Sequence, residues 1–191
     1  MRASVVSVIL IPPMLPVETI TRFDAFLAKR ALNLDAVVIG GAALAFLGVV
    51  GRPTRDCDIL HPELHADIKA AAQAFAQAVT ANGDLLDDDW LNNGPAILAS
   101  MLPEGWRNRL QVVFKGAAIR LQTLGRSDLL KTKLFGLCDR GLDLGDCIAL
   151  APSAHELREA RPWLELQDAH PGRAAHVAGT LADLGSRLGH V

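Results

Sequence analysis

The chain has 191 residues, of which half are hydrophobic, 21% are charged and three are cysteines. This composition is typical of a folded domain with a hydrophobic core, and it excludes a largely disordered chain and a disulfide-rich secreted scaffold. The formal net charge of −2 excludes a uniformly basic nucleic-acid-binding surface and an acidic tail, and the odd number of cysteines favours a reducing, cytoplasmic location.

Residues 1–17 are apolar but contain three prolines. Three interpretations of this segment are open: a secretory signal, a true start codon at Met14, and an edge strand over residues 5–11. The longest apolar run covers residues 36–50 and contains a Gly-Gly pair, so it is shorter than the roughly 20 residues that a membrane-spanning helix needs. We therefore expect no membrane segment.

Hydrophobic periodicity places four elements before residue 61. Ile20, Phe23 and Leu27 recur at helical spacing, whereas the β-branched run before the Gly-Gly pair indicates a buried strand. The stretch over 56–60 alternates polar and apolar residues, which is typical of a half-buried strand. The expected elements are a helix over 17–32, a strand over 36–39, a helix over 42–50 and a strand over 56–60.

Helices dominate the remainder of the chain. Pro62 is placed to open a helix that ends at Asn82 and Gly83, and Ser127 is placed to cap a later one. Two β-rich runs separated by residues 115–116 indicate a hairpin. The expected elements are a helix over 62–82, a helical turn at 96–102, strands over 109–114 and 117–124, and helices over 127–140, 143–150, 154–166 and 172–188.

This order of elements predicts an α+β protein, in which a small mixed β-sheet is flanked by helices and followed by a helical C-terminal part. We expect a core domain over residues 17–150 and a C-terminal helical extension over 151–191 that packs on it. The chain shows no internal repeat and no long linker that would favour further division.

Asp56 and Asp58 point most directly to chemistry. Residues two apart in a strand face the same side, so both carboxylates would lie together while Cys57 faces the core. Such carboxylates repel unless a cation lies between them, and Mg²⁺ is typically bound through one or two carboxylates and substrate phosphates. Gly40 and Gly41, between a strand and a helix, would expose backbone N–H groups that bind phosphate.

Each half of this pattern also has a purely structural interpretation, because Gly-Gly is a common turn and Asp-x-Asp arises by chance. Arg55, directly before Asp56, would neutralise phosphate or simply pair with that carboxylate. The two halves together, in the order strand, turn, helix, turn, strand, favour a site for a phosphorylated ligand and a divalent metal ion.

The Gly-Gly pair at 40–41, a short helix and the run Arg55-Asp-Cys-Asp-Ile-Leu60 resemble the signature of the DNA polymerase β-like nucleotidyltransferase superfamily. The later segments Ser127-Asp-Leu-Leu-Lys-Thr-Lys-Leu134, Asp139-Arg140 and Asp143-Leu-Gly-Asp146 are similar to the AbiEii-type nucleotidyltransferases of bacterial abortive-infection and toxin–antitoxin systems. The resemblance covers residues 20–150, and the tail matches less clearly.

The resemblance implies a mixed sheet flanked by helices and Mg²⁺-dependent transfer of a nucleoside monophosphate from an NTP to a hydroxyl acceptor. By motif position, Asp56 and Asp58 would hold the metal ions and act in catalysis. The residues that it places at the substrate are Gly40, Gly41, Arg55, Lys133 and Arg140, and the late acidic residues that it places in catalysis are Asp143 and Asp146.

One feature departs from the superfamily, many of whose members carry a third catalytic carboxylate on a later central strand. The expected strands over 109–114 and 117–124 contain neither Asp nor Glu. Either Asp143 or Asp146 takes that role from a helix, or the base is missing and the protein binds a nucleotide or a partner without transfer. A further alternative is an antibiotic-type transferase for small molecules, for which the acidic loop at 84–89 is the candidate acceptor site.

Charge is segregated along the chain. Residues 56–104 contain nine acidic residues and one basic residue, whereas residues 106–140 contain eight basic and two acidic residues. Such a field attracts a polyanion toward a metal site, although the two segments would also neutralise each other if they paired across the fold. For the catalytic hypothesis we expect RNA, such as a tRNA, or a protein as the acceptor, and an antitoxin protein as a partner.

Other notable residues have structural interpretations. Lys131 and Lys133 are two apart on a helix and cannot both face one site, and a solvated helix face is the alternative for either. The acidic residues 87–89 are interpreted as an exposed loop, and His61 and His65 as surface residues rather than zinc ligands. The residues interpreted as core are Cys57, Trp90, Trp106 and Trp163.

Overall fold

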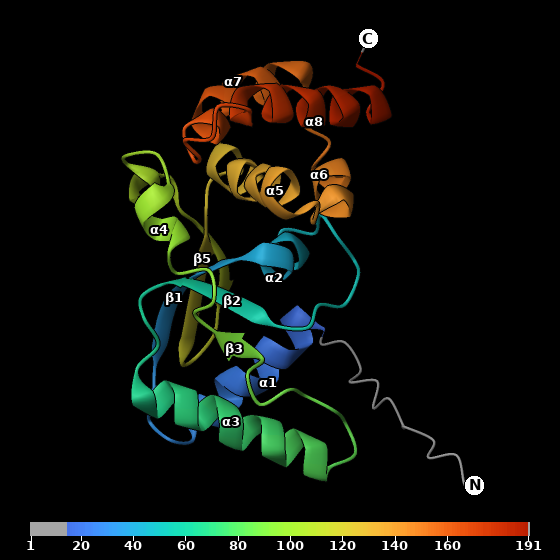
Figure 1. The fold of residues 1–191 in the computed structure, drawn as a ribbon. Coiled ribbons are helices and arrows are strands. Elements are labelled where there is room, and N and C mark those ends of the chain that lie inside the picture. The colour runs from blue at the N-terminus through green and yellow to red at the C-terminus, as the bar shows by residue number, and fades with distance from the viewer. Residues whose placement is uncertain (1–14, 191) are drawn as a thin grey trace, which may run out of the picture.

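The computed structural model describes residues 15–190, which form a mixed α+β fold (Figure 1). The strands are β1 (Leu34–Ile39), β2 (Cys57–His61), β3 (Leu91–Asn92), β4 (Gln111–Lys115) and β5 (Ile119–Thr123). The helices are α1 (Pro16–Ala28), α2 (Gly40–Phe46), α3 (Ala66–Ala81), α4 (Leu98–Met101), the 3-10 helix Trp106–Arg109, α5 (Arg126–Arg140), α6 (Leu144–Leu150), α7 (Ala154–Glu165) and α8 (Arg173–Arg187). The expected edge strand over 5–11 and the alternative start at Met14 lie outside the described residues.

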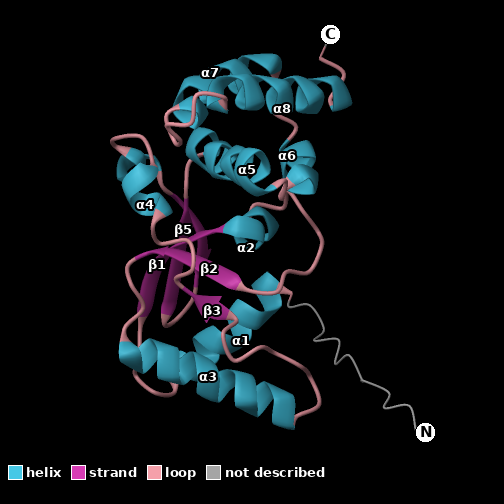
Figure 2. Ribbon diagram, in the orientation of Figure 1, coloured by secondary structure: helices cyan, strands magenta, loops and turns pink. Residues whose placement is uncertain are grey.

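The five strands form one mixed sheet in the order β3-β2-β1-β5-β4 (Figure 2). β1 is antiparallel to β2 and parallel to β5, while β4 and β5 form the expected antiparallel hairpin. β3 runs parallel to β2, and the sequence does not predict it because two residues are too few to show an alternating pattern. The predicted fold class, a small mixed sheet flanked by helices, is confirmed.

An aromatic cluster forms the core on one side of the sheet, where α1 and α3 lie together at the lower end of the molecule in Figure 1. The ring of Phe23 in α1 lies 5.1 Å from that of Trp90 and 5.3 Å from that of Phe75 in α3, centroid to centroid. Trp90 and Trp106 are both buried, as the sequence indicates. These contacts bury the periodic apolar faces of both helices.

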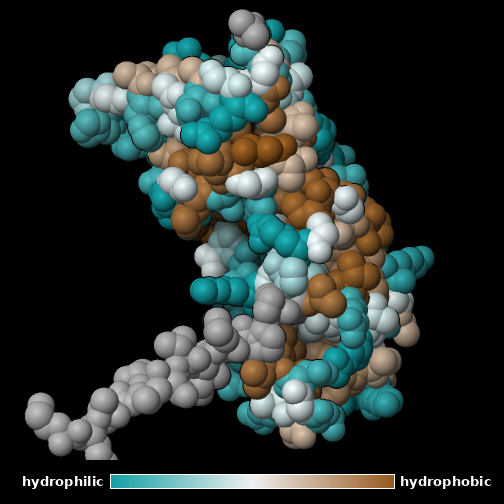
Figure 3. All heavy atoms as spheres, turned by 90° about the vertical axis from the view of Figure 1, so that its right-hand side faces the viewer, coloured by the Kyte–Doolittle hydropathy of each residue, from teal (hydrophilic) through white to brown (hydrophobic). Residues whose placement is uncertain are grey.

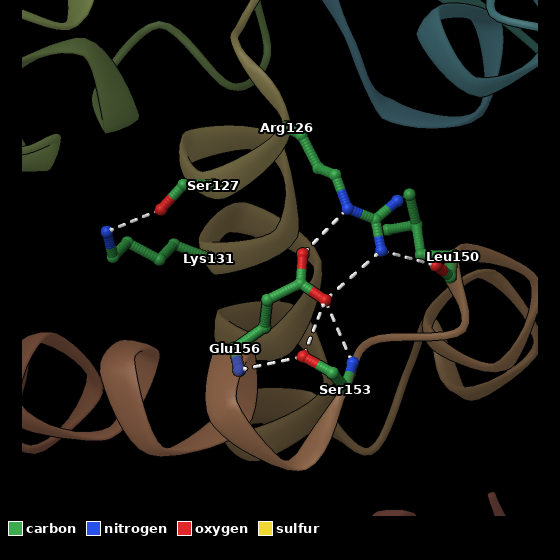
Figure 4. A network of polar contacts seen from close by, with 6 residues as sticks. All are labelled: Arg126, Ser127, Lys131, Leu150, Ser153 and Glu156. Atoms are coloured by element: carbon green, nitrogen blue, oxygen red, sulfur yellow. Dashed lines mark hydrogen bonds and ion pairs between the residues drawn. The ribbon is translucent and has the colours of Figure 1, made fainter.

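The C-terminal helices pack against α5. α7 and α8 lie above α5 in Figure 1. Arg126, at the start of α5, donates to Glu156 of α7 at 2.7 Å and to the carbonyl of Leu150 at 2.9 Å (Figure 4). Glu156 also accepts from the backbone N–H of Ser153 in a capping box that begins α7. α7 is therefore tied to α5 and to the end of α6, and the division into a core over 17–150 and an extension over 151–191 stays a prediction.

Hydrophobic residues gather on the face of the molecule that carries α6 (Figure 3). Leu142 and Ile148, before and within α6, are exposed in spite of their apolar side chains. No helix among residues 15–190 is long and apolar enough to cross a membrane.

The bounds of α3 and α2 differ from the expectation, the first because of a tertiary contact and the second because of a left-handed glycine. α3 begins at Ala66 rather than at Pro62. The side chain of Asn93 accepts from the N–H of Leu64 at 2.7 Å and donates to the carbonyl of Pro62 at 3.1 Å, so it holds this stretch outside the helix. α2 covers residues 40–46 instead of 42–50, and Gly48, with φ +69°, ends it in the left-handed conformation.

α5 starts one residue earlier than predicted. Gly125 precedes it, and a β-carbon there would lie 2.8 Å from the carbonyl oxygen of Arg109, so close packing fixes this start. Ser127 consequently lies inside the first turn and does not cap the helix. Its hydroxyl instead accepts a hydrogen bond of 3.1 Å from Lys131, as Figure 4 shows.

Candidate functional site

Residues from four parts of the chain line one cavity of about 570 Å³, a volume that suits a small-molecule ligand. Its walls come from the start of α2, the loop that enters β2, α5 and the loop before α6, with α4 beside them. All nine residues that the sequence places at the site line this cavity. The complete lining is Ile39, Gly40, Gly41, Arg52, Thr54, Arg55, Asp56, Asp58, Pro95, Leu98, Thr132, Lys133, Arg140, Leu142, Asp143 and Asp146.

Asp56 and Asp58 lie on the same wall of the cavity, as strand alternation predicts. Asp56 immediately precedes β2, and Asp58 is its second residue, paired with Ile39 of β1. Both side chains are half-buried and reach the cavity, whereas Cys57 between them is fully buried. The strand register therefore brings two carboxylates together at the point where β1 gives way to α2.

The electrostatics of this pair favour a bound cation. The pKa of Asp58 is raised to about 6, chiefly by burial and next by the charge of Asp56. Burial also raises the pKa of Asp56, which Arg55 partly opposes. Neither carboxylate forms an ion pair with another described residue. A divalent ion between them would relieve the repulsion that raises the pKa of Asp58.

The donor set fits Mg²⁺ better than a metal with an all-protein coordination shell. Within residues 15–190, no group of three or more His, Cys, Asp or Glu side chains is arranged to hold a metal ion. A cation beside Asp56 and Asp58 would take its remaining ligands from substrate phosphates and water, which is the usual arrangement for Mg²⁺.

The Gly-Gly pair brings the start of α2 against these carboxylates. Gly40 has φ +73°, and a β-carbon on it would lie 2.5 Å from Oδ2 of Asp58. A β-carbon on Gly41 would lie 2.8 Å from the methyl carbon of Thr54. Thr54 is itself buried, and its hydroxyl donates to the carbonyl of Asp56 at 3.0 Å. Both glycines are therefore needed for close packing between α2 and the loop that enters β2.

Lys133 of α5 is buried in the cavity wall and paired with two carboxylates. Its Nζ lies 2.7 Å from Oδ2 of Asp146 and 3.0 Å from Oδ1 of Asp143. Lys133 and Asp146 are 5% and 1% exposed, so the alternative of a solvated helix face is wrong for Lys133. Lys131 is held away from this group by its bond to Ser127, which confirms that the two lysines face different surroundings.

The late acidic residues enter the cavity from the start of α6. Asp143 is the residue before α6, and Asp146 lies in its first turn. Gly136, one turn beyond Lys133 on α5, makes room for this approach, because a β-carbon there would lie 2.5 Å from Oδ2 of Asp143. β4 and β5 contain no carboxylate, and the hydroxyl of Thr123 at the end of β5 donates to the carbonyl of Val38.

Arg52 is the charged residue of the cavity lining that the sequence does not predict. It lies in the loop between α2 and β2, which the Gly-Arg-Pro run indicates only as a turn. Its Nη2 donates to Oδ1 of Asp146, the carboxylate that also binds Lys133. The signal that could have found it is its place three residues before Arg55, in the segment that leads to Asp56.

The segregated charges are not neutralised by contacts between the acidic and basic segments. In the described part of the chain, Asp84 pairs with Arg22, and Glu63 pairs with Lys69. Neither of these two basic partners belongs to residues 106–140. The basic residues of 106–140 pair instead with carboxylates outside 56–104, as Arg109 does with Asp128. The acidic loop at 87–89 is exposed, as predicted, and it does not line the cavity.

Comparisons with known proteins give one family and one solved structure. A family model described as "Nucleotidyltransferase of unknown function (DUF6036)" matches residues 18–148. A crystal structure of an antigenic nucleotidyltransferase-like protein from Paracoccidioides brasiliensis matches with 16% identity and a TM-score of 0.48 over 92% of this chain and 91% of that chain. No curated protein matches.

Proposed function

The chain belongs to the family described as nucleotidyltransferases of unknown function, and we propose that it transfers a nucleoside monophosphate from an NTP to a hydroxyl acceptor with Mg²⁺. The observation that carries this proposal is the convergence of two glycines, two lone carboxylates and several cationic side chains in one cavity. These groups come from segments far apart in the sequence, and their types are those that a metal-bound triphosphate requires.

In this proposal, Asp56 and Asp58 hold the metal, which would supply positive charge at the reacting phosphate and the leaving group. The backbone at residues 40–41 and the side chains of Arg55, Lys133 and Arg140 bind and orient the triphosphate. The acceptor oxygen forms a bond to the α-phosphorus as the bond to the β-phosphate oxygen breaks, and pyrophosphate leaves.

The proton of the acceptor hydroxyl needs a base, and Asp143 is better placed than Asp146. Only one oxygen of Asp143 is bound to Lys133, and its side chain is 26% exposed. Both oxygens of Asp146 are engaged by cations, and its side chain is 1% exposed. Asp143 would therefore meet the acceptor, and the role that we assign to Asp146 is structural support of the site.

Nucleotide binding without transfer is the second candidate function. It is favoured by the lack of a carboxylate on β4 and β5, where many superfamily members carry the base. The ion pairs of Asp143 and Asp146 with Lys133 add to this argument, because a carboxylate bound to an ammonium ion is a weaker base.

For the acceptor we propose RNA, such as a tRNA, or a protein, in a toxin-like activity that a partner antitoxin would control. The support is the similarity of the segments over 127–134 and 139–146 to AbiEii-type enzymes. The alternative of a cationic small-molecule acceptor is not supported, because none of the acidic residues at 84–89, its candidate acceptor site, lines the cavity.

Incubation with each α-labelled NTP, Mg²⁺ and total RNA or a protein extract tests the proposal. We expect label on one acceptor class, and loss of labelling with Asp56→Asn and with Asp58→Asn. Asp88→Asn, an exposed carboxylate outside the cavity, is the matched control and should label normally. Labelling that survives both cavity substitutions would contradict the proposal, and Mg²⁺-dependent NTP binding without labelling would favour the second candidate.

A further inference from the structure

The side chain of Arg52 is about half exposed, although its guanidinium group is bound to a buried carboxylate. Its Nη2 donates to Asp146, whose side chain is 1% exposed, whereas 54% of the Arg52 side chain is exposed. Within the described residues, this is the one hydrogen bond that holds the guanidinium group. Arginine carries five N–H donors in a planar fork, so most of them stay available on the cavity side.

The backbone that carries Arg52 is held in place at a neighbouring residue. Thr54 is buried, packs against Gly41, and donates to the carbonyl of Asp56. The Arg52 side chain is thus fixed at its guanidinium end by a buried carboxylate and at its backbone end by a packed loop. A cation held in this way loses little conformational freedom when it binds an anion.

Asp146 joins Arg52 to Lys133. Its Oδ1 accepts from Arg52, and its Oδ2 lies 2.7 Å from Nζ of Lys133. One buried carboxylate therefore aligns two cations from different segments on the same cavity, next to Asp56 and Asp58. Two cations fixed side by side are suited to a chain of linked phosphates, which carries several charges in a row.

We propose that Arg52 binds the phosphate chain of the nucleotide through the guanidinium nitrogens that Asp146 leaves free, and that Asp146 is the positioning residue that aligns Arg52 and Lys133 for this contact. The inference rests on the proposed function, because the nucleotide is the ligand named there. It adds a phosphate-binding residue from the loop between α2 and β2, and it gives Asp146 a role other than proton transfer.

Inorganic tripolyphosphate is the direct probe, because it has the phosphate chain without base or sugar. Titration calorimetry in EDTA should show binding to the unmodified chain and binding weakened by about tenfold or more in Arg52→Gln. Arg161→Gln is the matched control, since Arg161 also donates to a carboxylate, Glu165, but lies outside the cavity. Equal affinity in Arg52→Gln, or no binding by the unmodified chain, overturns the inference.

Arg52→Lys distinguishes a phosphate-binding role of Arg52 from a purely structural role in its ion pair with Asp146. Lysine can keep the ion pair with Asp146, but it has one charged nitrogen and no fork that reaches a second anion. We expect an unchanged melting temperature together with weak tripolyphosphate binding. Full recovery of tripolyphosphate binding by Arg52→Lys would overturn the role of the free guanidinium nitrogens.

Asp146→Asn tests the positioning role at nearly constant side-chain volume. We expect the KM for NTP to rise about tenfold with a smaller change in kcat, because the substitution misaligns two phosphate ligands and removes no reacting group. A fall in melting temperature with an unchanged KM would overturn the positioning role. If this variant does not fold, the Arg52 substitutions decide the matter on their own.

The labelling assay separates this inference from the proposed function. Tripolyphosphate binding that depends on Arg52, without transfer of label by the unmodified chain, keeps the inference and overturns the transferase activity. If label is transferred but tripolyphosphate binding does not depend on Arg52, the transferase activity is kept and the inference about Arg52 is overturned.

Discussion

Gly40 lies so close to Asp58 that a β-carbon on the glycine would be 2.5 Å from the Oδ2 atom of the carboxylate. Gly40 also has φ +73°, a conformation that costs other residues roughly 1–2 kcal/mol. The missing side chain thus serves two purposes at once: it allows the turn into α2, and it leaves room for a carboxylate on the cavity wall.

Gly40→Ala is expected to lower both stability and NTP labelling, because the new methyl group must displace Asp58. Gly48→Ala is a matched control, since Gly48 has a similar φ of +69° but nothing within 4 Å of the β-carbon position. Gly48→Ala should cost about 1 kcal/mol of unfolding free energy, measured with urea, and leave labelling intact. Normal labelling by Gly40→Ala would show that the close approach to Asp58 is unimportant.

Asp58→Asn is expected to stabilise the metal-free protein at high pH. The pKa of Asp58 is raised to about 6 in the folded state, so the folded chain holds this proton longer than the unfolded chain does. Stability therefore falls as pH rises from about 4 through about 6, by about 3 kcal/mol. The substitution should recover that energy at about pH 8 and none at about pH 4, as urea denaturation in EDTA will show.

The exposed Asp88 again supplies the control, because Asp88→Asn should leave the pH profile of stability unchanged. A profile for Asp58→Asn that parallels the profile of the unmodified chain would mean that Asp58 does not titrate in this range. Gain of stability with loss of labelling would identify Asp58 as a group retained for function at a cost to the fold.

Removal of Mg²⁺ should remove most of the stabilisation by NTP. A ligand present at about one hundred times its Kd raises the unfolding free energy by about 2.7 kcal/mol, so NTP with Mg²⁺ should raise the melting temperature clearly. EDTA should remove most of this rise, and Asp56→Asn should remove it in the presence of Mg²⁺. The same shift with NTP in EDTA would argue against a metal held by the two carboxylates.

Gly136→Ala is expected to impair labelling without loss of helix stability. Its β-carbon would lie 2.5 Å from Oδ2 of Asp143, so it should push Asp143 away from Lys133 and lower kcat. Gly179→Ala in α8, with nothing within 4 Å, should stabilise the chain by about 0.5–1 kcal/mol and leave labelling unchanged. A normal kcat for Gly136→Ala would exclude a role for the position of Asp143.

Glu156 should contribute to stability at neutral pH and not in acid. Its pKa is lowered to about 2, first by Arg126 and then by the backbone of Ser153, so the contribution is complete above about pH 4.5 and disappears as pH falls toward about 2. Because Arg126 is half exposed, we expect Glu156→Gln to lower the unfolding free energy at about pH 7 by only about 1 kcal/mol. Glu159→Gln, an exposed residue of the same helix, should have no such effect.

Much of the site could be predicted because short sequence patterns determine it locally. The alternation around Cys57 predicts the shared orientation of Asp56 and Asp58, and the Gly-Gly pair predicts the turn into α2. The fold class follows from the order of periodic segments, each long enough to show its period.

The remaining features depend on contacts between distant segments, which no local pattern encodes. The burial of Lys133 follows from its pairing with Asp143 and Asp146, and α5 shows no sign of it in its sequence. The bond from Arg52 to Asp146 joins residues 94 positions apart. The start of α3 was mispredicted for the same reason, because Asn93 binds the backbone after β2 from a later part of the chain.

The C-terminal helices touch two walls of the cavity. The indole of Trp163 in α7 donates to the carbonyl of Met101 at 2.9 Å, and its ring lies 6.2 Å from that of Phe135 in α5, centroid to centroid. Met101 ends α4, whose first residue, Leu98, lines the cavity. Residue 163 therefore lies between α4 and α5, and its size affects the distance between these two walls of the cavity without any change to the polar groups inside.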